Sequence, residues 1–338
     1  MQALKRLTHT QAIWGMVLAP LLWAMAGVVT RQLETATRFE VTFWRSFFAG
    51  VSLLLLLPLL RVWDGSAATQ ANRPSITRWW GISPRSRSFW VSGLCWAVMF
   101  TAFMVALTMT SVAHVLVLLA AGPLFTAVLA RQVLRQTQPW RTWLSVWVAG
   151  AGIVYMFGSQ WLQAMADPAI DTTRLVVGTL VALCVPVAGA INWIVVQRSQ
   201  RHGQQIDLVP AVMVGGLLSA LGTLVPAWPL ATALHDLLWL AFLGLFQLAV
   251  PCVISVHCAR VLRAAEVSLL AQLEVIFGIL LVWWLAGEAP AQQVLIGGAV
   301  VLAALAGNEL ATWRDRRDVP RIQTLSAQDP NTASGEPS

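Results

Sequence analysis

Two ionisable residues lie inside long apolar stretches of the chain, where a charge is costly. Glu274 lies in the stretch 266–286 and Arg45 in the stretch 39–60. A charged side chain in hydrocarbon costs at least ~2.5 kcal/mol unless it meets water or a partner. Two interpretations of Glu274 follow: an acid that exchanges protons or contacts a solute, or a carboxylate tied permanently to an arginine or a backbone donor.

The depths of Arg45 and Glu274 predict that they can meet. If the two stretches enter from opposite surfaces, a rise of about 1.5 Å per residue places Arg45 ~9 Å deep and Glu274 ~12 Å deep. In a hydrocarbon core of ~30 Å the axial gap is then ~9 Å, within the combined reach of the two side chains on neighbouring helices. Arg45 could neutralise Glu274 in one conformation, bind a substrate carboxylate through its forked donors, or snorkel to the outer headgroups.

Amide side chains within apolar stretches are weaker candidates. Gln247 lies near the middle of one stretch, and Asn192 lies toward the end of another. Such amides more often join two helices by a hydrogen bond than contact a solute. Gln272 lies about 200° around a regular helix from Glu274, so we expect the two on different faces.

Four prolines interrupt apolar stretches. Each removes a backbone donor and leaves the carbonyl one turn earlier without its helical partner. In transporters such interruptions serve as hinges or binding groups, whereas in ordinary helix bundles they are tolerated kinks. The hinge candidates are Pro20, Pro123, Pro186 and Pro251.

The elements that must position these residues are membrane helices. The chain is 57% hydrophobic and only 11% charged, whereas soluble domains carry ~25% charged residues. Stretches near the ~20 residues needed to cross a bilayer recur throughout. This pattern predicts an all-α polytopic membrane protein of ten transmembrane helices. The predicted spans are 13–30, 39–60, 89–109, 113–130, 142–158, 175–197, 208–226, 237–257, 266–286 and 292–311.

The positive charge of the chain is distributed unevenly between its loops. With the N-terminus in the cytoplasm, the outer segments hold only Arg31, Arg38 and Arg174, Arg45 lies within a span, and all other Lys and Arg fall in inner segments. This is the positive-inside pattern. It predicts both termini in the cytoplasm, and it argues against nucleic acid as the partner of the basic residues.

The ends and the longest loop raise separate questions. The first span, with Lys5 and Arg6 before it, resembles a cleavable signal peptide, but its apolar residues continue past the cleavage-like site, so we expect it to be retained. The basic cytoplasmic loop 61–88 suits either a short element at the headgroups or a mobile loop. The polar tail 314–338 is predicted to be disordered.

The chain repeats itself in outline. Residues 89–155 and 241–307 superpose without a gap at an offset of 152, which aligns Phe125 with Phe277. The loop charges imply that the two halves, 10–158 and 174–311, face opposite ways. Inverted repeats of this kind are typical of secondary transporters. The turns at Gln136 and Glu288 also align, and Gly122-Pro123 aligns with Glu274-Val275.

Several short motifs resemble those of the EamA branch of the drug/metabolite transporter superfamily. The stretch Arg263–Pro290 contains Ala264-Ala265-Glu266, Glu274-Val275 and Gly287-Glu288, and the second span contains Phe43-Trp44-Arg45-Ser46-Phe47. The resemblance implies a ten-helix exporter or importer of small metabolites over residues 10–311. Val275 stands where the family commonly has proline, which puts any helix break at that step in doubt.

A secondary transporter of small organic metabolites, such as amino-acid-like compounds, is therefore the favoured function, with alternating access, export and proton coupling as expectations. The alternative is a non-transporting membrane scaffold or an intramembrane enzyme, although no catalytic motif occurs. A polar cavity near Glu274 would separate these hypotheses. High Trp and Arg content with little Lys indicates a GC-rich bacterial genome and hence the inner membrane.

Cofactors and protein partners leave little trace in the sequence. The four cysteines have no metal-site spacing, so we expect no metal and no cofactor. Small residues recur at helical spacing at Ser145-Ala149 and at Ala299-Ala303-Gly307. They predict close-packing faces, used either within the scaffold or in a homodimer.

Overall fold

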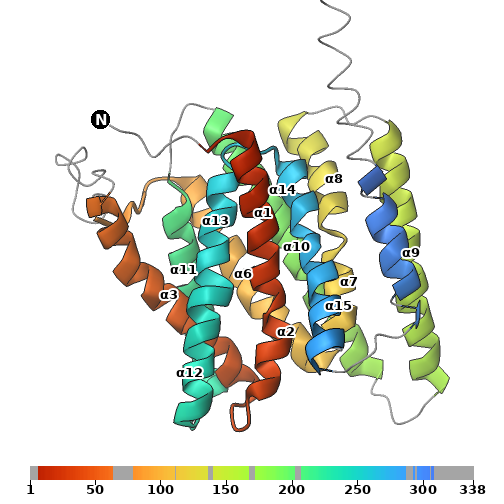
Figure 1. Ribbon diagram of the computed structural model, residues 1–338, viewed down its shortest axis with the longest axis horizontal. Helices are drawn as coiled ribbons and strands as arrows, with labels where there is room; N and C mark the ends of the chain where they lie inside the picture. Colours follow the sequence, from red (N-terminus) through yellow and green to blue (C-terminus); the bar gives the residue numbers. More distant parts are fainter. Residues whose placement is uncertain are drawn as a thin grey trace, which may run out of the picture.

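The computed structural model describes residues 7–63, 79–110, 112–135, 140–166, 172–201, 207–286 and 292–307, apart from 294 and 305. Within these ranges the regular structure is entirely helical, as predicted (Figure 1). The turns at Gln136 and Glu288, residues 64–78 of the basic loop and the tail 314–338 lie outside the described residues. The helices are α1 His9–Ala24, α2 Ala26–Val29, the 3-10 helix η1 Thr30–Gln32, α3 Arg38–Trp63, α6 Arg87–Met109, α7 Val112–Leu119, α8 Gly122–Leu134, α9 Trp140–Ala166, α10 Thr172–Arg201, α11 Val209–Ala227, α12 Leu234–Phe242, the π-helix η2 Leu243–Ala249, α13 Val250–Cys258, α14 Ala264–Ala271 and α15 Leu273–Ala286.

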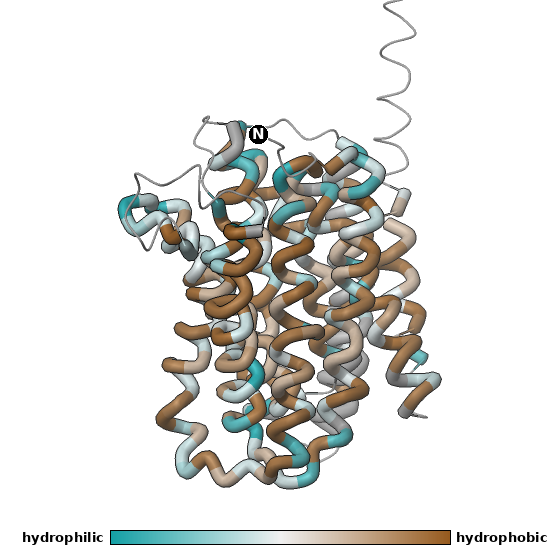
Figure 2. Tube along the Cα trace, turned by 60° about the vertical axis from the view of Figure 1, so that its left-hand side comes forward, coloured by the Kyte–Doolittle hydropathy of each residue, from teal (hydrophilic) through white to brown (hydrophobic). Residues whose placement is uncertain are grey.

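Seven helical segments of the described chain are long and apolar enough to cross a membrane, which confirms a polytopic membrane protein. The predicted span 113–130 is split between α7 and α8, and the predicted spans 142–158 and 292–311 contain shorter apolar helices, Trp143–Gly152 and Leu295–Ala304. The count of ten therefore stays a prediction. Figure 2 shows hydrophobic residues along the helices and hydrophilic residues gathered toward their ends.

Several spans are interrupted rather than continuous. The turn at Ala120-Ala121 separates α7 from α8, and the turn at Gln272, 152 residues after Ala120, separates α14 from α15. Pro123 has no N–H for the carbonyl of Leu119, which explains the first break. The second occurs without a proline: the amide of Val275 donates to Gln272 at 3.0 Å, one residue short of the α-helical partner. The doubt that Val275 raised about this break was therefore misplaced.

Glycines allow the central helices to approach closely. A Cβ added to Gly216 on α11 would lie 3.0 Å from the backbone of Ser46 and Gly50 on α3. A Cβ on Gly244 in η2 would lie 2.8 Å from the carbonyl oxygen of Arg45. Helices α6 and α10 also pack along their length, and α1 packs against α13, α14 and α15. The residues of α3 that face the interior are thus held between α11 and η2.

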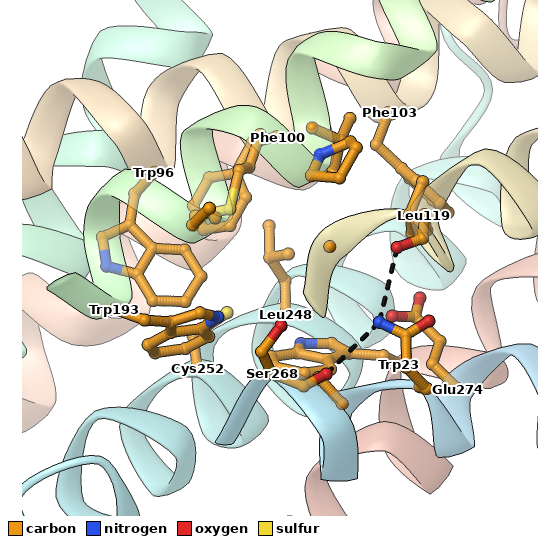
Figure 3. Close-up of a pocket in the computed structure, with 18 of the residues that line it drawn as sticks. Trp23, Trp96, Phe100, Phe103, Leu119, Trp193, Leu248, Cys252, Ser268 and Glu274 are labelled. Carbon is orange, nitrogen blue, oxygen red and sulfur yellow. Dashed lines mark hydrogen bonds between the residues drawn. The ribbon is translucent and has the colours of Figure 1, made fainter. Parts of the chain in front are cut away.

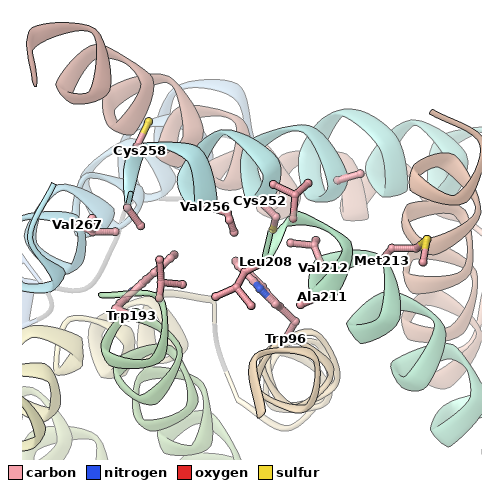
Figure 4. Close-up of a cluster of buried hydrophobic side chains, with 14 of the residues drawn as sticks. Trp96, Trp193, Leu208, Ala211, Val212, Met213, Cys252, Val256, Cys258 and Val267 are labelled. Carbon is pink, nitrogen blue, oxygen red and sulfur yellow. The ribbon is translucent and has the colours of Figure 1, made fainter. Parts of the chain in front are cut away.

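A cluster of buried side chains joins α6, α10, α11, α13 and α14 (Figure 4). It includes two of the cysteines, Cys252 and Cys258, which act there as small packing residues. Helix α9 packs against the last helix, where a Cβ on Gly152 would lie 3.0 Å from the carbonyl oxygen of Gly297. Of the small residues predicted for these two spans, Ala149 is buried against Val301, whereas Ala299, Ala303 and Gly307 are exposed in the single chain.

Helices α12, η2 and α13 follow one another without a loop and form a rod, and polar contacts anchor both ends of this rod to neighbouring segments. Beyond α13, Arg260 contacts Asp207 at 2.5 Å, and Arg61 pairs with the same carboxylate. Burial raises the pKa of Asp207, but the charges of Arg260 and Arg61 outweigh it, and the pKa lies below its ordinary value. Arg61 is buried and lies on α3, which contradicts its assignment to the basic loop.

The opposite end of this rod is held by Asp236, on the first turn of α12. Its carboxylate accepts hydrogen bonds from the backbone amides of Glu34, Thr35 and Ala36, at 2.7 to 3.2 Å, and from the Thr35 hydroxyl at 2.8 Å. Asp236 is fully buried. The segment between η1 and α3 is thereby fastened to α12.

Candidate functional site

A cavity of about 130 Å³ lies between the helices, and residues from both predicted halves line it (Figure 3). Most of its wall is apolar, and aromatic rings form one side. Five polar or charged residues reach it. The aromatic residues are Trp23, Trp96, Phe100, Phe103 and Trp193, and the polar ones are Arg45, Gln247, Ser268, Gln272 and Glu274. A cavity that several polar groups reach is thus present at Glu274, although most of its wall is apolar.

The aromatic side is organised around Trp96 on α6. Its ring lies 6.0 Å from that of Trp193 on α10, at an interplanar angle of 86°, and 5.5 Å from that of Phe100. These centroid distances are typical of favourable edge-to-face and tilted packing. In Figure 3, Trp96 and Trp193 lie on one side of the cavity and Glu274 lies on the other. The rings of Trp96 and Trp193 therefore lie at one end of the cavity, and the charged end, which contains Glu274, also has Trp23 beside it.

Arg45 is held in place by Gln247. Its Nη1 donates to Gln247 Oε1 at 3.2 Å, and Gln247 Nε2 donates to the carbonyl of Trp23 at 3.0 Å. The wider turn of the π-helix η2 carries Gln247, and Pro251 follows on α13. Irregular turns of this kind frequently occur at functional sites. Arg45 is only 1% exposed and lines the cavity, so it does not reach the headgroups as the snorkelling alternative required.

Glu274, on the first turn of α15, lines the cavity and keeps a partly accessible surface there. Among the described residues its carboxylate has no hydrogen-bond partner and no ion pair within 4.0 Å, with Arg45 or any other cation. Arg45 is nevertheless close enough for the two charges to interact. Glu274 is thus available to a proton or a solute in this conformation.

Gln272 lies in the break between α14 and α15 and also lines the cavity. The expectation that it and Glu274 occupy different faces is wrong, because the chain leaves α-helical geometry at Gln272 and the 100° step per residue no longer applies. Its Nε2 donates to two backbone carbonyls, those of Leu119 at 3.4 Å and Ser268 at 3.2 Å. Its Oε1 is buried and has no partner among the described residues.

The remaining candidates lie apart from this charged end. Asn192 Oδ1 accepts from Ser92 at 2.7 Å, which joins α10 to α6, and Asn192 is not part of the cavity wall. Pro186 lines the cavity on α10, and Pro20 lies within α1. Pro123 and Pro251 follow the irregular turns already described. Their use as hinges remains a prediction.

Sequence reasoning missed the aromatic wall and the orientation of Gln272. Aromatic residues occur in eight of the ten predicted spans, so no spacing singles out those of one cavity. Ser268 carried no signal, since serine is common in membrane helices. Gln272 carried a signal as an amide within an apolar stretch, but the assumption of a regular helix misplaced it.

Comparison with known proteins agrees with this architecture. Residues 10–158 match the model of the EamA-like transporter family. A solved crystal structure, described only as that of a protein, is similar over 92% of this chain and 99% of its own, with a TM-score of 0.61 and 17% identity, which concerns the fold alone. No curated protein matches the chain. This match agrees with the resemblance to the same family that the motifs in the second span and in Arg263–Pro290 carry.

Proposed function

We propose that the protein is a secondary transporter that exports small organic metabolites, such as amino-acid-like compounds, from the bacterial cytoplasm across the inner membrane. The observation that carries this proposal is Glu274, whose carboxylate lines a cavity between the two halves and has no partner among the described residues. Arg45 supplies the opposite charge at the same cavity. A small zwitterionic solute with an apolar body suits this combination of charges and aromatic rings.

Alternating access requires two halves that exchange roles, and the packing supports this. Helix α6 of the first half packs against α10, the first helix of the second half. In the same way, η2 and α13 of the second half pack against α1, the first helix of the first half. The breaks at Ala120 and Gln272 are also related by the offset of 152. We infer two inverted five-helix repeats with both termini in the cytoplasm.

Glu274 is the residue we assign to proton coupling. A carboxylate that no protein donor holds can be protonated when the cavity is empty and ionised when a cationic group occupies it. Export of solute in exchange for protons then follows from competition at a single group. Arg45 lines the same cavity but forms no ion pair with Glu274 within 4.0 Å.

The test is counterflow of a metabolite panel in proteoliposomes, with and without a proton gradient. Wild-type protein should accumulate at least one labelled solute, and an imposed gradient should change its rate. In Glu274→Gln the gradient should have no effect. Glu266→Gln is the matched control, because Glu266 lies at the start of the α14–α15 span, outside the cavity wall, where it accepts from the Arg263 amide. A gradient response retained by Glu274→Gln would overturn the assignment, and no counterflow of any solute would overturn the transporter.

A further inference from the structure

The orientation of the Gln272 amide follows from its partners. Both groups that receive its hydrogen bonds are backbone carbonyls, of Leu119 and Ser268, and carbonyl oxygens only accept. The atom facing them must therefore be Nε2, which leaves Oε1 as the free end (Figure 3, dashed lines). The carbonyl of Leu119 needs this donor because Pro123 cannot supply one.

Gln272 Oε1 has no donor among the described residues. Gln272 is 6% exposed, and its Oε1 is buried without a hydrogen bond from that part of the chain. A buried acceptor without a partner costs about 1–3 kcal/mol. Glu274, two residues further on, lines the same cavity and also has no donor among the described residues. The charged end of the cavity thus contains two acceptor groups that a ligand with several donors can satisfy.

A solute that satisfies both Glu274 and Gln272 Oε1 supplies several hydrogen-bond donors and a positive charge. A primary ammonium group has three N–H donors in a compact cation, which can serve Glu274 and Gln272 together. A hard metal ion fits less well, since it takes six or more oxygen ligands, whereas the rest of this cavity is mostly apolar and aromatic. The rings of Trp96 and Trp193 suit the apolar body of an organic amine.

We propose that Gln272 is a specificity-determining residue, which together with Glu274 receives the primary ammonium group of the transported solute. The proposal rests on the transport function and deepens it. Such a site discriminates between solutes by their N–H donors as well as by their charge, because a quaternary ammonium group carries the charge but leaves Gln272 Oε1 without a hydrogen bond. Sites with buried hydrogen-bonding groups reject ligands that lack the partner far more strongly than apolar pockets reject a change of size.

Three probes of one skeleton test this idea by direct binding to the purified full chain. Phenylalanine carries a primary ammonium, its N,N,N-trimethyl derivative carries the charge without N–H donors, and 3-phenylpropionate lacks the ammonium. Wild-type protein should bind phenylalanine at least about tenfold more tightly than either of the others, which is what one hydrogen bond to a charged group contributes. Equal affinity for 3-phenylpropionate would overturn the proposal, even if no variant folds.

The variant Gln272→Met removes the acceptor and keeps the length of the side chain. Its affinity for phenylalanine should fall at least about tenfold, while its affinity for the trimethyl derivative should stay within about twofold of wild type. Thr126→Val is the matched control: Thr126 hydrogen-bonds to Gly122 and Ser268 at the same helix crossing but does not line the cavity. If Gln272→Met lost the same factor of affinity for both ligands, Gln272 would not recognise N–H donors. Displacement of bound phenylalanine by sodium ions alone would also contradict the proposal.

This inference and the transport function can fail separately. Counterflow of 3-phenylpropionate or other solutes without an ammonium would leave a transporter but refute the ammonium site. Ammonium-dependent binding that requires Gln272, with no counterflow of any bound amine, would leave the site and refute the transporter.

Discussion

Replacement of Gly244 by alanine should damage both stability and the cavity. An added Cβ would lie 2.6 Å from the Cβ of Phe48, 2.8 Å from the carbonyl oxygen of Arg45 and 2.9 Å from the amide of Ala49, and ordinary contact begins at 3.4 Å. None of these α3 atoms is the far end of a flexible side chain, so η2 and α3 must separate by about 0.8 Å. The hydrogen bond of 3.2 Å between Arg45 and Gln247 would then stretch toward about 4.0 Å, beyond hydrogen-bonding distance.

The magnitude follows from two opposing effects. Forcing an extra carbon into a packed interface costs about 1–3 kcal/mol, and alanine recovers up to about 1 kcal/mol of helix propensity. We therefore expect a net loss of about 1–2 kcal/mol, which lowers the melting temperature by roughly 1–3 °C in a chain of this size. The assay is thermal unfolding of purified protein in detergent, followed by size-exclusion chromatography with fluorescence detection.

The control is another helical glycine at which an added Cβ would have no neighbouring atom. A Cβ on Gly222 of α11 would meet nothing within 4 Å, so Gly222→Ala should be neutral or stabilising. Gly244→Ala should also weaken solute binding, because Arg45 loses its support. If Gly244→Ala melts at or above the wild-type temperature, the close approach of η2 to α3 described above is wrong.

Two further predictions concern the ends of the bundle. Because the pKa of Asp207 is lowered in the folded protein, its contribution to stability should be complete above about pH 5 and should disappear as the pH falls through that lowered pKa. The melting temperatures of wild type and Asp207→Asn should therefore differ at pH 7 and converge in acid. A difference that stays constant with pH would contradict this linkage. Asp236→Asn places an amide against three backbone donors and should destabilise the chain by about 2–3 kcal/mol, measured by the same melting assay. Glu34→Gln is its control, because only the backbone of Glu34 contacts Asp236, and equal melting of the two variants would refute the tie.

The membrane class and much of the candidate site could be predicted from the sequence because they depend on local composition. Apolar stretches of bilayer length identify helices without knowledge of their neighbours. A charged or amide side chain within such a stretch is unusual enough to be noticed, and Arg45, Gln247 and Glu274 all line the cavity. Asn192 shows the limit of this signal, since its amide serves a hydrogen bond to Ser92 away from the cavity.

The tertiary structure decided which of these residues act together. Arg45 and Glu274 lie 229 positions apart, and the packing of η2 against α3 gives Arg45 a partner in Gln247 rather than in the carboxylate. The aromatic wall likewise combines residues from distant helices.

Gln272 shows most clearly where prediction from the sequence ends and the tertiary structure decides. By sequence it shares an apolar stretch with Glu274 at a spacing that a regular helix would direct to another face. The break at this position depends on contacts with another span, where the carbonyl of Leu119, left without a donor by Pro123, receives the Gln272 amide. A sequence can reveal that a polar residue lies within the membrane, but the direction it faces depends on which distant backbone group lacks a hydrogen bond.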